Sequence, residues 1–264
     1  MSILLDRHTP VLVQGITGRV GRAQTHWMLA YGTNIVAGVT PGRGGAQIEG
    51  IPVFDTVKEA RDQRGARASV LFVPAAAAAE TLYETIDAGI DLIVVVTEHI
   101  PVHDVMRVRS YAMKTRCTLL GPTTPGILTP GEAKMGIMPA GLFSRGPVGI
   151  VSRSGTLAYE IAGNLTSAGI GQSTVVGMGA DPVVFTNLPA ILSLFQEDPE
   201  TRCIVIVGEV GGVQEEMAAE FIREYITKPV VAYIAGQQTP EGKRMGHAGA
   251  LVQRGMGSAR SKIN

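Results

Sequence analysis

Residues 11–21 read VLVQGITGRVG, a short apolar run that ends in a glycine-rich turn and leads directly into a helical pattern. The run predicts a buried strand, and the pattern from about Val20 to Tyr31, closed by Gly32, predicts a helix. A turn of this kind leaves free backbone N–H groups at the positive end of the helix, where a phosphate group binds well. The stretch therefore predicts the first strand–turn–helix unit of an α/β fold.

The same alternation continues along the chain. Further strands are expected at 34–39, 68–73, 92–96, 118–120, 148–151, 174–176, 203–207 and 230–234. Helices are expected at about 76–88 and 102–113 and from about 156, 188 and 215. Strands that alternate with helices predict parallel sheets with helices on both faces. A stretch rich in proline and glycine, Gly121 to Gly146, interrupts the pattern and predicts a junction between two α/β domains, 1–125 and 126–264.

Composition narrows the class of protein. The chain has 264 residues, 45% of them hydrophobic, which is enough for two medium-sized cores. Its net charge of zero gives no electrostatic case for nucleic acid. No apolar run reaches the roughly 20 residues that a membrane helix needs, and no signal peptide is visible. Cys117 and Cys203 match no CxxC pattern, so we expect a cytoplasmic protein without structural disulfides. We also expect no membrane partner and no metal site.

The loop after the second expected strand favours a phosphorylated ligand. The first turn has the spacing GxxGxxG instead of GxGxxG, and Arg43 stands among glycines where dinucleotide enzymes carry a carboxylate. A cation suits an extra phosphate, as on NADP or on the 3′-phosphate of coenzyme A. A plain glycine turn is the alternative. Glu98, after the fourth expected strand, is suited either to accept hydrogen bonds from a ligand or to cap the next helix.

A second strand–turn–helix unit lies at residues 150–157, IVSRSGTL. Ser154 and Thr156 are helix-capping residue types, and the N–H groups of the first helical turn form a second anion site. The GxSxG spacing of a nucleophile elbow is absent, which argues against a serine hydrolase.

His247 lies in the run RMGHAGA, residues 244–250, where small neighbours leave the ring within reach of a reactive group. Glu209 follows an expected strand and is suited to hold an imidazole in one tautomer. The alternatives are a loop histidine without a role and a solvated loop acid.

Seven segments together resemble the α subunit of succinyl-CoA synthetase, also called succinate–CoA ligase. They are VQGITG (13–18), GVTPGRGG (38–45), GIMP (136–139), GIVSRSGTL (149–157), DPET (198–201), GEVGG (208–212) and KRMGHAGA (243–250). The resemblance spans essentially the whole chain and implies a Rossmann-like CoA-binding domain (1–125) followed by a flavodoxin-like ligase domain (126–264). Malate–CoA ligase and the CoA-ligase portion of ATP-citrate lyase belong to the same superfamily.

The resemblance also implies a mechanism. A β subunit that holds ATP or GTP with Mg²⁺ phosphorylates His247, in an αβ or α2β2 assembly, and Glu209 steadies the phosphohistidine. The phosphoryl group passes to a small dicarboxylic acid, first of all succinate, and CoA then attacks the acyl phosphate. Since no P-loop pattern GxxxxGK[ST] occurs in this chain, we expect the nucleotide on the partner.

The resemblance assigns further positions by their place in the motifs. Those for CoA are Thr17, Gly18, Arg19, Val20, Arg43, Val96, Thr97 and Glu98; those for the phosphate cradle are Ser154, Gly155 and Thr156; Tyr159 is the position for the acid.

Some positions depart from the family pattern. Thr123-Thr124 replaces an Asn-Cys pair, His99 and Ala180 each replace a glycine, and Ala140-Gly141 replaces Gly-His. These changes leave open which acid is activated, so malate–CoA or citrate–CoA ligase is an alternative. A non-catalytic CoA-binding or NADP-binding regulator is a more distant one. Family members continue beyond the position of Asn264 for a further helix–strand–helix.

Overall fold

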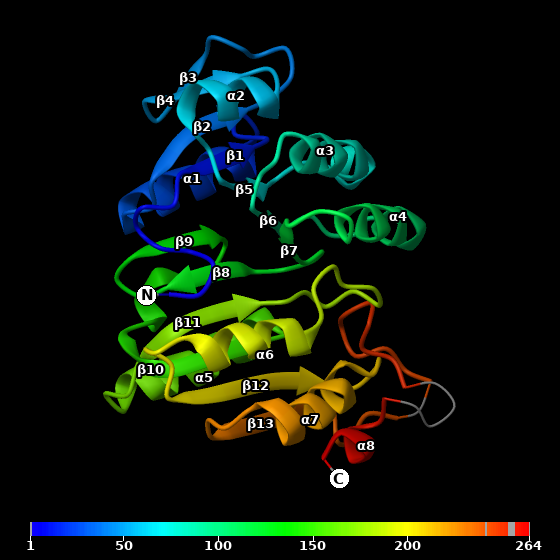
Figure 1. Ribbon diagram of the computed structural model, residues 1–264. Helices are drawn as coiled ribbons and strands as arrows, with labels where there is room; N and C mark the ends of the chain where they lie inside the picture. Colours follow the sequence, from blue (N-terminus) through cyan, green and yellow to red (C-terminus); the bar gives the residue numbers. More distant parts are fainter. Residues whose placement is uncertain (1, 241, 253–256, 264) are drawn as a thin grey trace.

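The computed structural model describes residues 2–240, 242–252 and 257–263. In this part of the chain, two β-sheets lie one after the other along the molecule (Figure 1). The first sheet has the strand order β3-β4-β2-β1-β5-β6-β7. Its strands are β1 (Val11–Gln14), β2 (Ile35–Val39), β3 (Gln47–Ile48), β4 (Ile51–Phe54), β5 (Ala68–Leu71), β6 (Leu92–Val95) and β7 (Thr118–Leu120). All neighbours are parallel except β3 and β4.

Four helices accompany this sheet: α1 (Arg19–Tyr31), α2 (Val57–Arg64), α3 (Ala75–Asp87) and α4 (Val102–Ala112). Apolar side chains of α2, α3 and α4 pack in one hydrophobic cluster with Leu12, Leu71 and Ile93 of the sheet. The alternate strand residues, such as Val13 and Val70, pack in a second cluster with Met28 of α1. Both faces of the sheet are therefore covered, as buried parallel strands require.

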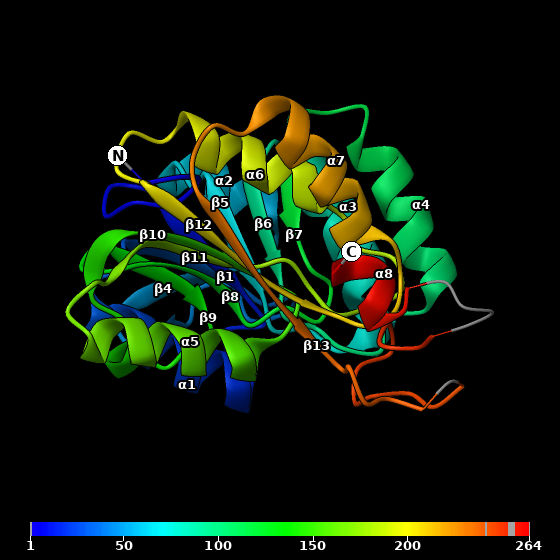
Figure 2. The same ribbon diagram turned by 90° about the horizontal axis from the view of Figure 1, so that it is seen from below.

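The second sheet has the strand order β13-β12-β10-β11-β8-β9. Its strands are β8 (Gly126–Thr129), β9 (Ala133–Gly136), β10 (Arg145–Ser152), β11 (Gln172–Gly177), β12 (Cys203–Glu209) and β13 (Val230–Ala235). The helical elements are η1 (Ala140–Leu142), α5 (Gly155–Ser167), α6 (Leu188–Glu197), α7 (Gln214–Tyr225) and α8 (Ala259–Ile263). Figure 2 shows α5 on one face of this sheet and α6 and α7 on the other.

The expected α/β class with two mainly parallel sheets is confirmed. The stretch Gly121 to Gly146, for which no strand was expected, contains the β8–β9 hairpin. All four residues of β8 are buried, and β8 pairs antiparallel with β11, so a contact distant in sequence determines its conformation. Helix α2 was not expected either, because its apolar stripe consists of only Val57 and Ala60.

The two sheets share a hydrophobic core. One cluster contains Val13 and Val94 of the first sheet together with Met135 and Val176 of the second. Backbone hydrogen bonds also cross between the two parts, from Gly121 N–H to the Met178 carbonyl. Because the core is continuous, the proposed limits 1–125 and 126–264 stay a prediction. None of the described helices has the length and apolarity needed to span a membrane.

Candidate active site

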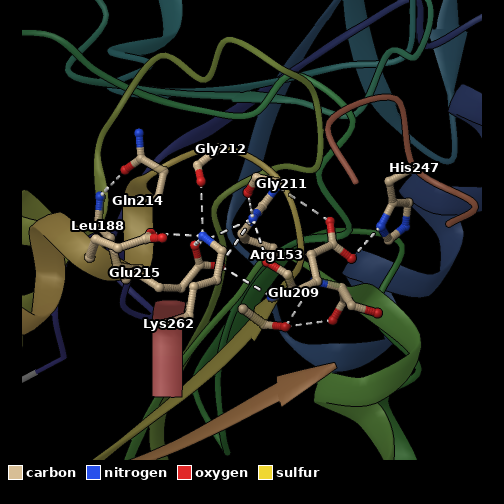
Figure 3. Close-up of polar contacts among 12 residues, drawn as sticks. Arg153, Leu188, Glu209, Gly211, Gly212, Gln214, Glu215, His247 and Lys262 are labelled. Carbon is tan, nitrogen blue, oxygen red and sulfur yellow. Dashed lines mark hydrogen bonds and ion pairs between the residues drawn. The ribbon is translucent and has the colours of Figure 1, made fainter. Parts of the chain in front are cut away.

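His247 and Glu209 form a close pair at the carboxyl edge of the second sheet (Figure 3). Nδ1 of His247 lies 2.8 Å from Oε2 of Glu209. The Glu209 side chain is 6% exposed and the His247 side chain 34% exposed, so the acid is fixed in the protein while the ring reaches the surface. An ionised carboxylate only accepts hydrogen bonds, so Nδ1 carries the proton. The other ring nitrogen, Nε2, is then left with its lone pair, as a nucleophile requires.

The pair changes the acidity of the ring. The hydrogen bond to Glu209 raises the pKa of His247 above its ordinary value of 6.5. Burial and the charge of Arg153 lower this pKa, whereas the charges of Glu209 and Glu98 raise it, and the net direction is upward. The ring is therefore a stronger base than a free imidazole, and it stays neutral only above a correspondingly raised pH.

Glu209 is held by the buried Arg153, which follows β10. Nη2 of Arg153 lies 3.5 Å from Oε1 of Glu209. Nη1 donates to the carbonyls of Glu209 at 3.0 Å and Gly211 at 2.8 Å. Because β10 and β12 are parallel neighbours, their carboxyl ends bring Arg153 and Glu209 together. Burial of the Glu209 side chain excludes its interpretation as a solvated loop acid.

The loop that carries His247 packs on the turn after β12. Gly211 has φ +88°, and a Cβ at this position would lie 2.1 Å from the Gly249 carbonyl oxygen. The Gly249 N–H in turn donates to the Ala180 carbonyl at 3.0 Å. The absence of a side chain at Gly211 thus allows the histidine loop to approach Glu209.

We expect Gly211→Ala to push the histidine loop away from Glu209. The φ value alone costs about 1–3 kcal/mol of unfolding free energy for a non-glycine residue, and the clash with the Gly249 backbone adds to it. Gly212→Ala is the matched control, because Gly212 also has positive φ (+65°) but no atom within 4 Å of a Cβ. Denaturant unfolding should show the larger loss for Gly211→Ala, and equal losses would contradict the packing role.

The start of α5 directly follows Arg153 in the sequence. Ser154 is the N-cap of α5, and its hydroxyl accepts a hydrogen bond from the Leu157 N–H. Gly155 and Thr156 stand in the first turn, whose N–H groups have no partner within the helix. Such a helix start binds anions. The Tyr159 hydroxyl lies 3.3 Å from where a Cβ on Gly155 would be, and burial raises its pKa to about 12.

A cavity of about 390 Å³ adjoins the histidine loop. Its lining includes Arg153, Asp181, Arg244 and Gly249. Asp181 accepts a hydrogen bond from Thr123 Oγ1 at 2.9 Å, which ties the end of the first sheet to the second. Burial raises the pKa of Asp181; the Thr123 hydrogen bond lowers it, the charge of Glu98 raises it, and the charges of His99 and His247 lower it. These groups from both sheets are therefore close enough to influence one another.

The positions assigned to CoA lie at the carboxyl edge of the first sheet. Gly18 is the N-cap of α1, without a capping side chain or an acidic residue in the first turn. Arg19 and Val20 are exposed beside it, and the Thr17 hydroxyl lies 3.2 Å from that of Thr40. The spacing GxxGxxG is explained by close packing: a Cβ on Gly21 would lie 2.1 Å from the Gly15 carbonyl oxygen.

Arg43 is exposed in the loop after β2, and Asp55 accepts its backbone N–H at 2.9 Å. Val96 is half-buried. Thr97 is buried, and its hydroxyl donates to the Val73 carbonyl at 2.9 Å, which makes it part of the frame. Glu98 is exposed and pairs with His99, so it does not cap α4, whose N-cap is Pro101.

The sequence did not single out three side chains that the structure brings to these sites. Asp55 supports the Arg43 loop, and Asp181 joins the two sheets near His247. Glu215 contacts Arg153 behind Glu209. Asp181 and Asp55 each follow a strand end, which was the available signal; Glu215 resembles an ordinary acidic residue in the first turn of a helix.

Neither cysteine is in a disulfide. Within the ranges that the structure describes, no three His, Cys, Asp or Glu side chains are arranged as metal ligands.

Two family models match this chain. The family described as "CoA binding domain" matches residues 6–99, and the family described as "CoA-ligase" matches residues 151–264. The succinate–CoA ligase [ADP-forming] subunit alpha 2 of Archaeoglobus fulgidus is 56% identical over 263 residues, covering 100% of this chain and 91% of the relative. The corresponding α subunit of Aquifex aeolicus is 54% identical and is covered to 87%.

Solved structures show the same fold. ATP citrate lyase from Methanothrix soehngenii, in complex with citrate and coenzyme A, matches 98% of this chain with a TM-score of 0.88 and 26% identity. This chain spans 46% of that longer chain. A Ca. Korarchaeum cryptofilum acetyl-coenzyme A synthetase matches with a TM-score of 0.70 at 20% identity, which supports the fold alone. With its two matching domains and full-length relatives, this chain belongs to the family of succinate–CoA ligase α subunits.

Proposed function

We propose that this chain is the α subunit of an ADP-forming succinate–CoA ligase in which His247 carries the phosphoryl group. The observation that supports this most is the 2.8 Å contact between Nδ1 of a partly exposed histidine and a buried carboxylate. A non-catalytic CoA-binding or NADP-binding regulator has no use for this pair. Membership of a ligase family also argues for the enzyme.

In the first step, Nε2 of neutral His247 attacks the γ-phosphorus of the nucleotide. An N–P bond forms, and the bond between this phosphorus and the β-phosphate oxygen breaks, so the nucleoside diphosphate leaves. Nδ1 keeps its proton, and the positive charge that develops on the ring is balanced by Glu209 at 2.8 Å. The first-turn N–H groups of α5, at Gly155 and Thr156, are proposed to hold the transferred phosphoryl group.

In the second step, a carboxylate oxygen of the acid attacks this phosphorus and the N–P bond breaks, which gives an acyl phosphate and free His247. The CoA thiol then loses its proton to solvent and attacks the acyl carbon. The C–S bond forms and the C–O bond to phosphate breaks. The half-buried Tyr159, next to Gly155, is proposed to face the acid.

The first domain is proposed to hold CoA. The exposed start of α1 at Gly18, Arg19 and Val20 suits the pyrophosphate, and Arg43 suits the 3′-phosphate. Thr17 and the segment Val96 to Glu98 border the same edge, and buried Thr97 would act through the backbone.

A β subunit is proposed as the partner, in an αβ or α2β2 assembly within the cytoplasm. It would supply the nucleotide site, where Mg²⁺ would neutralise phosphate charge. The relatives are named as ADP-forming ligases, which supports ATP as the nucleotide.

Succinate is the acid that the 52–56% identical relatives support. Citrate is a second candidate, because the citrate-bound lyase has the same fold over 98% of this chain. We expect the complex with its β subunit to form succinyl-CoA with a higher kcat/KM than either malyl-CoA or citryl-CoA, measured by thioester absorbance with each acid in turn. A preference for citrate or malate would overturn succinate as the substrate and leave the phosphohistidine untouched.

Arg43→Glu should raise the KM for CoA by about 10-fold or more, since one charge-assisted phosphate contact is lost and a repulsion added. Phosphorylation of His247 should stay nearly unchanged, because Arg43 stands on the other domain. Arg116→Glu, an exposed charge change at the opposite edge of the same sheet, is the control. Steady-state CoA titration and single-turnover phosphorylation measure the two effects, and an equal loss of both would contradict this role of Arg43.

A further inference from the structure

Buried side chains of alternating charge connect helix α8 to His247 (Figure 3). Lys262 Nζ of α8 lies 2.5 Å from Glu215 Oε2, and Glu215 Oε1 lies 3.0 Å from Arg153 Nη1. Arg153 Nη2 lies 3.5 Å from Glu209 Oε1, and Glu209 Oε2 contacts His247. Lys262 is thus connected to His247 through three charged side chains, those of Glu215, Arg153 and Glu209.

All four charged side chains behind His247 are excluded from solvent. The exposed fraction is 0% for Lys262, 4% for Glu215 and 6% for both Arg153 and Glu209. Burial raises the pKa of Glu215, but the charges of Arg153 and Lys262 outweigh it, so the net pKa is lowered. Removal of one charge from such a chain leaves its neighbour uncompensated, and the effect is poorly screened because water is excluded.

The same side chains also fix the turn after β12. Glu215 Oε1 accepts the Glu209 N–H at 3.1 Å, and Arg153 donates to the Gly211 carbonyl. Lys262 donates to the Gly212 carbonyl at 3.1 Å. The turn that carries Glu209 and supports the histidine loop is therefore held at both ends by this charge chain.

We propose that Lys262 is a positioning residue for the phosphohistidine chemistry, acting on His247 through Glu215, Arg153 and Glu209. The proposal rests on the proposed function of His247. Lys262 Nζ contacts Oε2 of Glu215 at 2.5 Å and Oε2 of Glu216 at 2.9 Å. Its contact with Glu215 balances part of that carboxylate, which leaves Arg153 shared between Glu215 and Glu209. Without Lys262, Arg153 is drawn toward Glu215, and Glu209 attracts the proton of His247 more strongly.

The sign of the effect follows from the charges around the ring. Those that act on His247 are Glu209, Arg153 and Glu98, and Asp181 is coupled to it from the loop after β11. Arg153 lowers the pKa of His247, so a weaker Arg153 influence raises this pKa further. Loss of Lys262 thus shifts the titration of His247 to higher pH. Neutralising Glu215 together with Lys262 frees Arg153 for Glu209 and shifts the titration to lower pH.

The test compares Lys262→Met with Lys262→Arg and with the exposed α8 control Arg260→Met, all in the full chain with its β subunit. Lys262→Met should slow single-turnover phosphorylation about 10-fold or more, the effect of losing a supporting contact behind a working side chain. The acid limb of its pH profile should move to higher pH, while the KM for CoA is unchanged. Lys262→Arg should restore both values.

A second readout does not depend on ligase activity. The rate at which diethyl pyrocarbonate modifies His247, followed by mass spectrometry of its peptide against pH, reports the titration of the ring directly. Here Lys262→Met should move the midpoint up, and the double variant Lys262→Met, Glu215→Gln should move it down. The double variant removes two opposite buried charges together, which keeps the interior neutral if the single variant does not fold.

Unchanged midpoints in the variants, or a shift in the same direction for both, would overturn the proposal. If the wild-type complex never phosphorylates His247 but the two variants still move the midpoint in opposite directions as predicted, the proposed function is refuted. The electrostatic coupling between Lys262 and His247 then still holds. If Lys262→Met lowers only the melting temperature and phosphorylates like Arg260→Met, Lys262 has a structural role alone and the proposal fails.

Discussion

Replacing His247 by Asn should abolish formation of acyl-CoA by the complex with its β subunit, with a loss of about 10⁴-fold or more. Asn keeps a polar side chain in the loop but has no ring nitrogen with a free lone pair. Since the side chain of His247 is one-third exposed, the substitution leaves no large cavity, and the melting temperature should change little. The measurement is transfer of radioactive phosphate from ATP to the α chain, as an acid-labile and base-stable label.

His26→Asn is the control for this experiment, because His26 is also exposed to solvent and lies in α1, where its ring pairs with Glu49 and not with Glu209. The control should label and turn over like the unchanged protein. Base-stable label that persists in His247→Asn would contradict the assignment. Full labelling with no acyl-CoA formation in the unchanged protein would show instead that the proposed later steps, acyl-phosphate formation and attack by CoA, are wrong.

Glu209→Gln should have the second largest effect, slowing phosphorylation by about 10²–10⁴-fold, the range expected when an orienting acid is lost. Gln has nearly the same volume, so packing is conserved. However, its amide does not demand a proton on Nδ1, and it brings no negative charge to balance the phosphorylated ring. Glu220→Gln, an exposed change on α7, is the control.

The pH dependence of this variant has a definite sign. The hydrogen bond with Glu209 raises the pKa of His247 above 6.5, so the neutral, reactive ring is populated only at higher pH. In Glu209→Gln the acid limb of the rate profile should therefore move to lower pH, although the plateau rate falls. An acid limb that stays in place would show that another group controls the profile.

The raised pKa of His247 also predicts how the unfolding free energy depends on pH. A histidine whose folded pKa is raised stabilises the fold fully below its unfolded pKa, and this contribution disappears as the pH rises through the folded pKa. The unchanged protein should thus gain stability relative to Glu209→Gln when the pH falls from above the folded pKa of His247 to just below 6.5. Denaturant unfolding at both pH values measures this difference.

The sequence predicted the parts of this molecule that depend on local patterns. The apolar runs at β1, β5, β6, β10 and β12 are buried parallel strands, and each is followed by a turn and helix as expected. His247 was identifiable because a histidine is unusual in a loop of small residues, and Glu209 because an acid follows an expected strand. The motif resemblance made their partnership predictable, although 38 residues separate them.

Other features depend on contacts that no local pattern contains. Strands β8 and β9 lie among prolines and glycines, and their pairing with β11 was visible only in three dimensions. Glu215 and Lys262 resemble ordinary charged residues of surface helices, yet their side chains are almost completely buried and paired. His99 and Thr123 have positive φ values of 62° and 56°, which explains why the family pattern has glycine and asparagine at these positions.

The central claim is tested most directly by locating the phosphoryl group on the α chain. The unchanged α chain is incubated with its β subunit and ATP, without CoA or acid, digested at alkaline pH and sequenced by mass spectrometry. The account predicts the phosphoryl group on the imidazole of His247 and its loss when succinate and CoA are added. A phosphoryl group on Ser154 or Thr156, with His247 unmodified, would contradict it.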